Sequence, residues 1–236
     1  MSDEPPAVEI RELTSAAEAH EAARVLAEVW PGDRQAMPAN ILRALGHSGN
    51  YLVGVFDAER MVGASAAFFG PPEARTMHSH ITGVLPGMQG RGVGRALKRH
   101  QRDWAFARGV GHITWTFDPI LARNAHFNLR VLGARVTEYL VDQYGAMDDD
   151  VNRGDASDRL LVSWALAEPP APTPSPTQVE AEVMIPADIE TMRRETPAAA
   201  AAWRGVVRDT LLGHLAKGLR IGGFDDDRGY LLVAPD

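Results

Sequence analysis

The chain has 236 residues, of which 45% are hydrophobic and 23% charged, so it can bury a full core as one large domain or as one domain with a small appendix. Its net charge of -7 argues against nucleic acid or an anionic membrane as the main partner, and the lack of a ~20-residue apolar run or of a basic, apolar N-terminal signal predicts a cytoplasmic protein without a membrane span. Because there is no cysteine, disulfides, cysteine metal sites and a cysteine acyl-enzyme intermediate are excluded.

The N-terminal segment predicts one strand, two helices and a β-hairpin, in that order. Residues 8–13 alternate as a strand does, and a helix over residues 17–30 follows, with Thr14 or Ser15 as its N-cap. A second helix follows Pro38 and is ended by residues 46–50. The strands of the hairpin are expected at residues 51–56 and 61–69.

A strand over residues 76–85 leads into a glycine-rich turn, residues 89–94 (QGRGVG), and then into a long helix. Glycines remove the Cβ atoms that would keep a ligand away from the backbone. The amides at the start of the helix can then bind an anion, and Arg91 and Arg95 can add charge-assisted hydrogen bonds. The alternative is a turn of ordinary glycines at a helix start.

The remaining elements alternate between strands and helices. Strands are expected at residues 112–117, 135–142 and 159–166, with a helix at 121–132 between the first two. After a proline-dense stretch come a strand at 179–185, helices at 188–195 and 198–215, and strands at 220–224 and 230–233. Helical spacing puts one set of side chains of the last helix on a common face: Ala199, Ala202, Trp203, Val206, Thr210 and Leu211.

The order of residues around the glycine turn closely resembles the pyrophosphate loop of the GNAT superfamily of N-acetyltransferases. That loop reads Gln/Arg-x-x-Gly-x-Gly/Ala after a strand ending in Val-x-Pro, and here Val84 and Pro86 precede the turn. A Walker A loop would need Gly-Lys-Ser/Thr, whereas Arg95 follows the last glycine. A dinucleotide fingerprint would need Gly-x-Gly-x-x-Gly, which the spacing of the three glycines does not supply.

The resemblance implies a fold and a domain plan. The element order β-α-α-β-β-β-α-β-α-β-β over residues 8–166 is that of the GNAT fold, an α/β (α+β) fold with a mixed, mostly antiparallel central sheet flanked by helices. We therefore expect a GNAT acyltransferase domain at residues 1–167 and a proline-rich linker at 168–178. Residues 179–236 are expected to form a small C-terminal α/β subdomain that docks on the core or on a second chain, as in a homodimer.

The resemblance also implies acetyl-CoA, or another acyl-CoA, as co-substrate. Asn124 would lie beside its pantetheine arm, and the expected contacts along the loop are Val84, Leu85, Gln89, Gly90, Arg91, Gly92, Val93, Gly94 and Arg95. No metal is expected: His78 and His80 with His112 or His126 could form a three-ligand site, but no H-E-x-x-H pattern supports one.

In this family the strand before the loop commonly supplies the general base, and His80 is the candidate here. Histidine has an unperturbed pKa near ~6.5, which suits proton removal at neutral pH. Alternation along the strand predicts a shared face for His78, His80, Thr82 and Val84. A buried histidine that bonds to a neighbouring strand is the alternative.

The general acid is less obvious, because Leu129 stands where the family often has the tyrosine that protonates the departing CoA sulfur. A thiol with a pKa near ~8.5 leaves with little proton assistance, so transfer does not require that tyrosine. Tyr144 is the candidate substitute, with Tyr139 as the alternative.

The predicted acceptor contacts come from the strand that should flank the cleft and from the segment beyond it. Trp115 and Phe117 share a face of that strand, and Asp118 follows them in a turn. Core packing and a structural turn are the alternatives. The polar segment 143–158 is interpreted as a lid, in which Arg153 or Arg159 could hold an acceptor carboxylate.

Together these features predict a CoA-dependent N-acyltransferase that acts by direct attack in a ternary complex. The expected acceptor is the amine of a small molecule or an amino acid. The alternatives are succinyl-CoA as donor, a protein amine as acceptor, and a module that binds acyl-CoA as a sensor without turnover.

Overall fold

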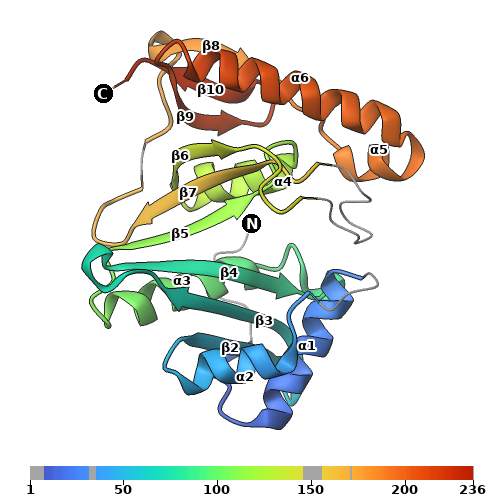
Figure 1. The fold of residues 1–236 in the computed structure, drawn as a ribbon, viewed down its shortest axis with the longest axis vertical. Coiled ribbons are helices and arrows are strands. Elements are labelled where there is room, and N and C mark those ends of the chain that lie inside the picture. The colour runs from blue at the N-terminus through green and yellow to red at the C-terminus, as the bar shows by residue number, and fades with distance from the viewer. Residues whose placement is uncertain (1–7, 32–35, 146–155, 171, 236) are drawn as a thin grey trace. The chain divides into compact units, whose positions relative to one another are not determined.

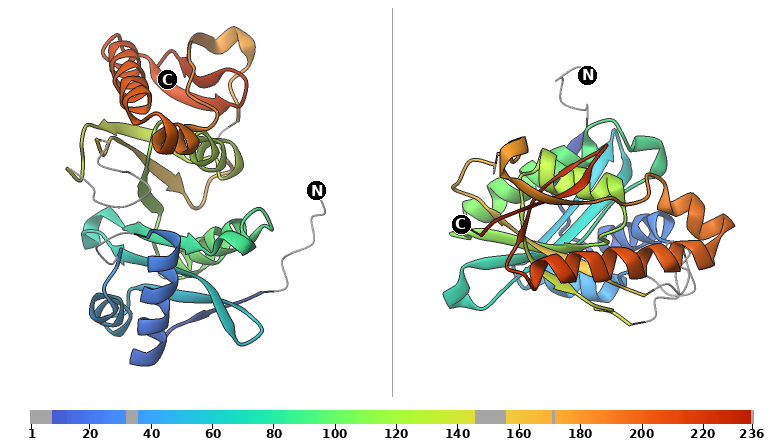
Figure 2. Two further views of the ribbon diagram at one scale, coloured as in Figure 1. Left: turned by 90° about the vertical axis from the view of Figure 1, so that its right-hand side faces the viewer. Right: turned by 90° about the horizontal axis from the view of Figure 1, so that it is seen from above.

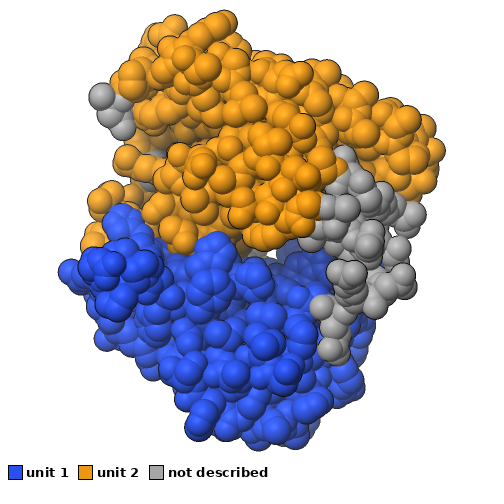
Figure 3. All heavy atoms as spheres, viewed as in Figure 1, with its two compact units in different colours: residues 1–113 blue, residues 114–236 orange. Residues whose placement is uncertain are grey.

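The computed structural model describes residues 8–31, 36–145, 156–170 and 172–235. The chain forms two compact units, Met1–Ile113 and Thr114–Asp236, which Figure 3 shows in separate colours. Each unit is described below by itself. The predicted domain boundaries at residues 167 and 178 stay a prediction.

The first unit holds a four-stranded antiparallel sheet with strand order β1-β2-β3-β4 (Figure 1). Its strands are β1 (Glu9–Glu12), β2 (Tyr51–Asp57), β3 (Arg60–Phe69) and β4 (Thr76–Val84). Its helices are α1 (Ala16–Val29), α2 (Ala39–His47) and α3 (Val93–Phe106), with short 3-10 turns η1 (Pro72–Ala74) and η2 (Pro86–Met88). Every element predicted for this region is present within a few residues of its expected bounds.

Local sequence explains how the first helix begins and which face it buries. Ser15 is the N-cap of α1, because its side chain accepts from the Glu18 amide while the Glu18 side chain accepts from the Ser15 amide. The Arg11 guanidinium and these bonds lower the pKa of Glu18 to about 2. The buried face of α1 packs against β3 and β4 and consists of Ala19, Ala22, Ala23, Val25 and Leu26.

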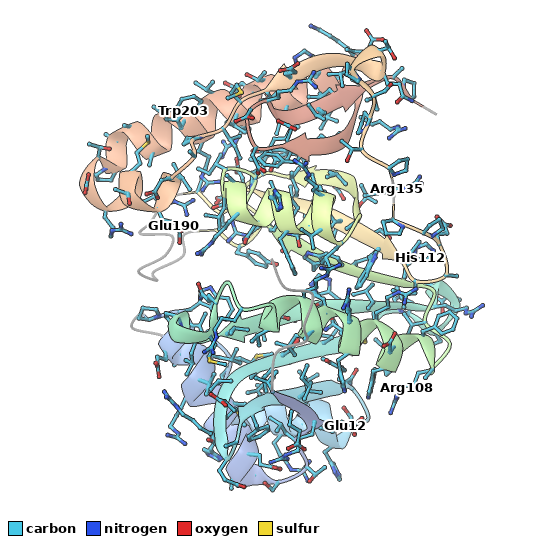
Figure 4. All side chains as sticks on the ribbon, turned by 180° about the vertical axis from the view of Figure 1, so that it is seen from behind. Glu12, Arg108, His112, Arg135, Glu190 and Trp203 are labelled. Carbon is cyan, nitrogen blue, oxygen red and sulfur yellow. The ribbon has the colours of Figure 1, made fainter. Side chains whose placement is uncertain are left out.

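Helix α3 packs against β4 on the face opposite α1. A Cβ atom on Gly83 would lie 2.8 Å from the Trp30 side chain beyond α1, whereas Ser79 accepts a hydrogen bond from Lys98 of α3. At its far end, α3 is tied to the first strand, since Trp104 Nε1 donates to a Glu12 carboxylate oxygen over 2.6 Å. The Arg108 guanidinium lies 3.6 Å from the same oxygen; Figure 4 labels both ion-pair partners.

A β-bulge at His80 changes the phase of β4. Strand β3 pairs Ala67 with Ser79 and Ala66 with Ile81, which leaves His80 as the extra residue. Directly opposed residues share a face, so Thr82 lies on the face of Ser79, and its hydroxyl is 2.8 Å from that of Ser65. The predicted alternation is therefore wrong beyond His80, because a bulge inserts one residue into a period of two.

The second unit continues from strand β5 (His112–Phe117), which begins in the first unit and lies next to β7 (Arg159–Ala165) in strand order β5-β7-β6. Strand β6 (Arg135–Leu140) pairs antiparallel with β7. The helix predicted between β5 and β6 is present as α4 (Ala122–Ala125) followed by η3 (His126–Val131), which has π-helical geometry. Such single π turns are often found at functional sites.

A three-stranded antiparallel sheet with strand order β8-β10-β9 completes the second unit. Its elements are η4 (Pro176–Gln178), β8 (Val179–Val183), α5 (Ile189–Glu195), α6 (Pro197–Leu215), β9 (Arg220–Asp225) and β10 (Gly229–Val233). Figures 1 and 2 show α6 lying along one face of this sheet.

The buried face of α6 is made by Ala200, Arg204, Val207 and Leu211. Of the six residues that helical spacing puts on a common face, Leu211 is buried and Val206 is 57% exposed. Five consecutive alanines at residues 198–202 give little hydrophobic contrast around the helix. The orientation of α6 follows instead from Arg204, whose guanidinium pairs with the buried carboxylate of Asp118.

Candidate functional site

The loop after β4 forms a glycine turn that opens into α3. Gly90 and Gly92 have φ values of +74° and +83°, a left-handed conformation that glycine adopts at little cost. Gln89 anchors the turn, because its side-chain Nε2 donates to the Val84 carbonyl over 3.0 Å. Before the turn, the Leu85 amide donates to the Val62 carbonyl of β3 over 2.9 Å, so the loop starts from a fixed point of the sheet.

Beyond Gln89 the backbone donors of the loop are unused. Within the part of the chain that the structure describes, the amides of residues 90–95 donate to no other group. A Cβ atom on Gly90 or Gly94 would meet nothing within 4 Å, so the space beside this backbone is open. Arg91 and Arg95 are exposed on the same turn.

This donor set fits a diphosphate. Free amides at a helix N-terminus add the helix dipole to their own partial charges, and two guanidinium groups supply full positive charge. The loop residues predicted from the sequence, Val84, Leu85 and residues 89–95, lie on one continuous segment from the end of β4 to the start of α3, and their predicted contact with acyl-CoA stays a prediction. Asn124 lies in α4, where its backbone amide bonds to the Leu121 carbonyl; its predicted contact with pantetheine stays a prediction.

His78 and His80 lie side by side near the exposed ring of Phe68. The ring centroids of the two histidines are 6.3 Å apart, and that of Phe68 is 5.3 Å from His78 and 5.8 Å from His80. Burial lowers the pKa of both imidazoles, and for His78 the neighbouring His80 and Lys98 lower it further. Both rings are therefore neutral at pH 7, the form that accepts a proton.

A buried lysine lies behind this strand, and sequence reasoning missed it. Lys98 of α3 donates to Ser79 Oγ over 2.9 Å and to Gln101 Oε1 over 3.1 Å. Burial lowers its pKa to about 7. The signal that could have found it is its rarity: Lys98 is one of two lysines in the chain, and it takes an inner position of an otherwise amphipathic helix.

In the second unit the two aromatic residues predicted to line the acceptor site are buried. Trp115 Nε1 donates to Asn128 Oδ1 over 3.1 Å, and its ring meets Trp164 edge-on at 6.2 Å between centroids. Phe117 is 4% exposed. Both side chains belong to the core of this unit, and their predicted contact with an acceptor stays a prediction.

Asp118, predicted as a further acceptor contact, is a buried charge centre. Its carboxylate oxygens accept from Arg193 at 2.5 Å and from Arg204 at 3.1 Å, and one also accepts from the Ile120 amide at 3.1 Å. Burial acts to raise its pKa, but the two arginines hold the pKa below its ordinary value. The predicted acceptor role of Asp118 stays a prediction, because the contacts described here are structural.

Of the two candidate acids, Tyr144 is exposed and Tyr139 is buried. Tyr144 is 46% exposed, its hydroxyl is 2.9 Å from Thr116 Oγ1, and its ring centroid is 5.4 Å from the Arg159 guanidinium. Tyr139 is buried and donates to Asp158 over 2.7 Å, and burial raises its pKa. An exposed, oriented hydroxyl suits proton donation, whereas the Tyr139 hydroxyl is committed to a carboxylate.

Arg159 is a buried residue that contacts Tyr144 and Asp158. Its Nη1 donates to the Asp158 carbonyl over 2.8 Å, and burial lowers its pKa. The proposed lid falls largely on residues 146–155, including Arg153, which lie outside the described residues. Among the described residues, no group of three or more His, Asp or Glu side chains could hold a metal, and no helix is both long and apolar enough to cross a membrane.

Comparison with known proteins gives consistent findings. The model of the acetyltransferase (GNAT) family matches residues 12–134. The N-alpha-acetyltransferase RimI of Mycobacterium tuberculosis is 36% identical over 110 residues, which are 46% of this chain and 68% of that protein.

Solved structures show the fold. YncA of Salmonella typhimurium, solved with its cofactor acetyl-CoA, has a TM-score of 0.54 and 20% identity over 70% of this chain and 97% of its own. The spermidine/spermine N-acetyltransferase SpeG of Vibrio cholerae has a TM-score of 0.53 and 14% identity over 68% and 95%. The expected α+β architecture is thereby confirmed.

Proposed function

This chain belongs to the acetyltransferase (GNAT) family, and we propose that it transfers an acetyl or other short acyl group from acyl-CoA to the amine of a small molecule or amino acid. Transfer occurs by direct attack of the amine in a ternary complex. The observation that carries the proposal is the run of unused amides at residues 90–95, beside open space and two arginines.

Acyl-CoA supplies the activated thioester. The loop amides and the guanidinium groups of Arg91 and Arg95 hold its diphosphate, and the dipole of α3 strengthens this contact. Gln89 fixes the start of the loop, because its side-chain Nε2 donates to the Val84 carbonyl.

His80 accepts the proton that the acceptor amine loses. Its lowered pKa keeps the ring neutral at pH 7, and the bulge leaves its ring at an exposed position of β4. Tyr144 donates a proton to the departing thiolate, and its hydrogen bond with Thr116 orients the hydroxyl.

A protein N-terminal amine is the second candidate acceptor. The relative that shares 36% identity over 110 residues is an N-alpha-acetyltransferase, whereas SpeG, which shares only the fold, is a spermidine/spermine N-acetyltransferase. The net charge of -7 favours a cationic amine of either kind, because opposite charge steers the approach of the acceptor.

The experiment is a CoA-release assay with acetyl-CoA and succinyl-CoA against three acceptor classes: amino acids, polyamines, and peptides with free or blocked N-termini. Turnover with free amino acids or polyamines supports the first proposal. Turnover confined to peptides with free N-termini supports the second. Binding of CoA without turnover on any acceptor would overturn the transfer reaction and leave an acyl-CoA sensor.

A further inference from the structure

The second unit contains a cavity of about 390 Å³ that the acyltransfer proposal does not use. It lies among η3, the start of β6, strand β9 and the proline-rich segment 172–178. Its volume falls in the range of small-molecule sites, roughly 300–1,000 Å³. We call it the arginine cavity, after Arg130, Arg135 and Arg220 in its lining.

One wall of the arginine cavity is built by a close approach that requires glycine. A Cβ atom on Gly222 would lie 3.0 Å from Pro174 Cγ, and one on Gly223 would lie 3.0 Å from Pro174 Cδ. Two consecutive glycines in β9 therefore let the proline-rich segment lie directly on the strand. Gly222 is also the extra residue of a bulge, since β10 pairs Leu231 with Gly223 and Leu232 with Ile221.

The proline-rich segment is held in this position by its own hydrogen bonds. Ser175 and Gln178 form a capping box, in which the Gln178 amide donates to the Ser175 side chain and Gln178 Oε1 accepts from the Ser175 amide at 2.9 Å. Prolines at residues 172, 174 and 176 restrict the backbone further. The wall is therefore a defined structure rather than a loose linker.

The charge of the lining is one-sided. Among the described lining residues there are three arginines and no acidic side chain. Arg130 has acidic neighbours at a distance: its Nη1 is 3.7 Å from Asp225 and 3.8 Å from Asp226, neither of which lines the cavity. Arg135 is exposed at the start of β6 and is labelled in Figure 4.

The rest of the lining is largely apolar. Leu129, Ile221 and Phe224 supply aliphatic and aromatic surface beside the guanidinium groups. Leu129 holds the position where the family often has a tyrosine, and here it is a lining residue of this cavity in the second unit. A ligand that satisfies both halves of the lining has an anionic head and a short apolar body.

We propose that the arginine cavity binds a small organic anion, with a carboxylate or phosphate head that engages the arginines and an apolar body that packs on Leu129, Ile221 and Phe224. Arginine suits this role because its planar guanidinium binds both head groups with two parallel hydrogen bonds. The site does not depend on the acyltransfer reaction, since none of its residues belongs to the proposed catalytic set.

The test is calorimetry on the full chain with four probes: benzoate, phenyl phosphate, the neutral isostere benzamide, and inorganic phosphate. We expect benzoate or phenyl phosphate to bind, and benzamide and inorganic phosphate to bind at least tenfold more weakly, because each lacks one half of the ligand. The comparison of benzoate with phenyl phosphate identifies the preferred head group. Equal binding of benzoate and benzamide would overturn the role of the arginines.

Three variants locate the site. Arg135→Gln changes an exposed residue and Thr173→Trp fills the cavity from the exposed proline-rich segment, so both should fold; Arg220→Gln removes a more buried charge. Each should weaken binding of the preferred probe about tenfold or more. The control is Arg228→Gln. Arg228 lies between β9 and β10, pairs with Glu182 of β8 and does not line the cavity. Absence of binding by every probe, or binding unchanged in all three variants, would overturn the proposal.

Discussion

Two polar regions of this chain satisfy their hydrogen-bonding groups in opposite ways. Around β4 and α3, donors are left over: within the described residues, neither the amides of residues 90–95 nor the buried Gln101 Nε2 has an acceptor. In the second unit the two buried carboxylates are saturated. Asp118 accepts from Arg193 and Arg204, and Asp158 accepts from Arg208, Tyr139 and a backbone amide.

The contrast separates binding from structure. Unused donors beside open space cost little while water solvates them, and they become favourable when an anion replaces the water. Buried carboxylates whose oxygens already accept these hydrogen bonds have no acceptor capacity left for a ligand. Asp118 instead holds α5 and α6 at the turn after β5, and Asp158 holds α6 at the start of β7. Single substitutions can test each side of this contrast.

The saturated side should respond most strongly to loss of a carboxylate. Asp118→Ala leaves two arginines buried without their anion, so we expect the free energy of unfolding to fall by about 3–5 kcal/mol. Urea denaturation measures this change. Glu182→Gln, which breaks the surface pair with Arg228, is the matched control and should cost less than about 1 kcal/mol. If the free energy of unfolding falls by a similar amount in both variants, the buried ion pairs of Asp118 do not stabilise the fold more than a surface pair does.

On the open side, His80→Ala should lower kcat about 100-fold, the typical contribution of a positioned general base, while the Kd for CoA stays unchanged. Because burial lowers the pKa of His80, the acid limb of kcat/KM for the native enzyme should lie below pH 6.5, and the variant should lose that limb. His78→Ala is the control, with a smaller effect. Steady-state kinetics over pH 5–9 measures this change, and an unchanged kcat in His80→Ala would remove the base assignment.

Lys98 makes the stability of the open side depend on pH. Its pKa is about 7 when folded and near the ordinary 10.5 when unfolded, so the unfolded chain binds more protons between these values. Burial of Lys98 therefore lowers the free energy of unfolding most below pH 7, and the free energy of unfolding rises as pH increases toward 10.5. Relative to Lys98→Met, the native chain should gain on the order of 2–3 kcal/mol between pH 6 and pH 9.

Denaturation of both proteins at several pH values measures this difference. The Lys98→Met variant serves as the reference, because the other titrating groups are common to both chains. A difference that stays constant with pH would mean that Lys98 keeps its ordinary pKa when folded.

The smallest expected effect concerns the backbone of the loop. Gly90→Ala adds a Cβ into open space but forces a left-handed conformation, which costs about 1–2 kcal/mol. We expect a roughly tenfold weaker Kd for CoA by calorimetry, as the amides shift. Gly87→Ala, also in open space but without positive φ, is the control. Equal losses in the two variants would contradict an anion site formed by this loop geometry.

Much of the fold could be predicted from the sequence, because helices, strands and turns follow from patterns over a few residues. The order of elements from residue 8 to residue 166, the N-cap at Ser15 and the glycine turn were all predictable on that basis. The loop residues of the candidate site belong to the same class. Their proposed function rests on glycine spacing and on the start of a helix, both of which are local.

Local patterns in the sequence were enough to predict the helices, the strands and the glycine turn, since the geometry of each is set within one turn or strand. Tertiary packing set three further features: the bulge at His80, the burial of Lys98, and the partners of Asp118, which come from 75 and 86 residues further along the chain. The physical reason is that a charge or a bulge is settled by the surface that comes to lie against it. No pattern within a single helix or strand states which surface that will be.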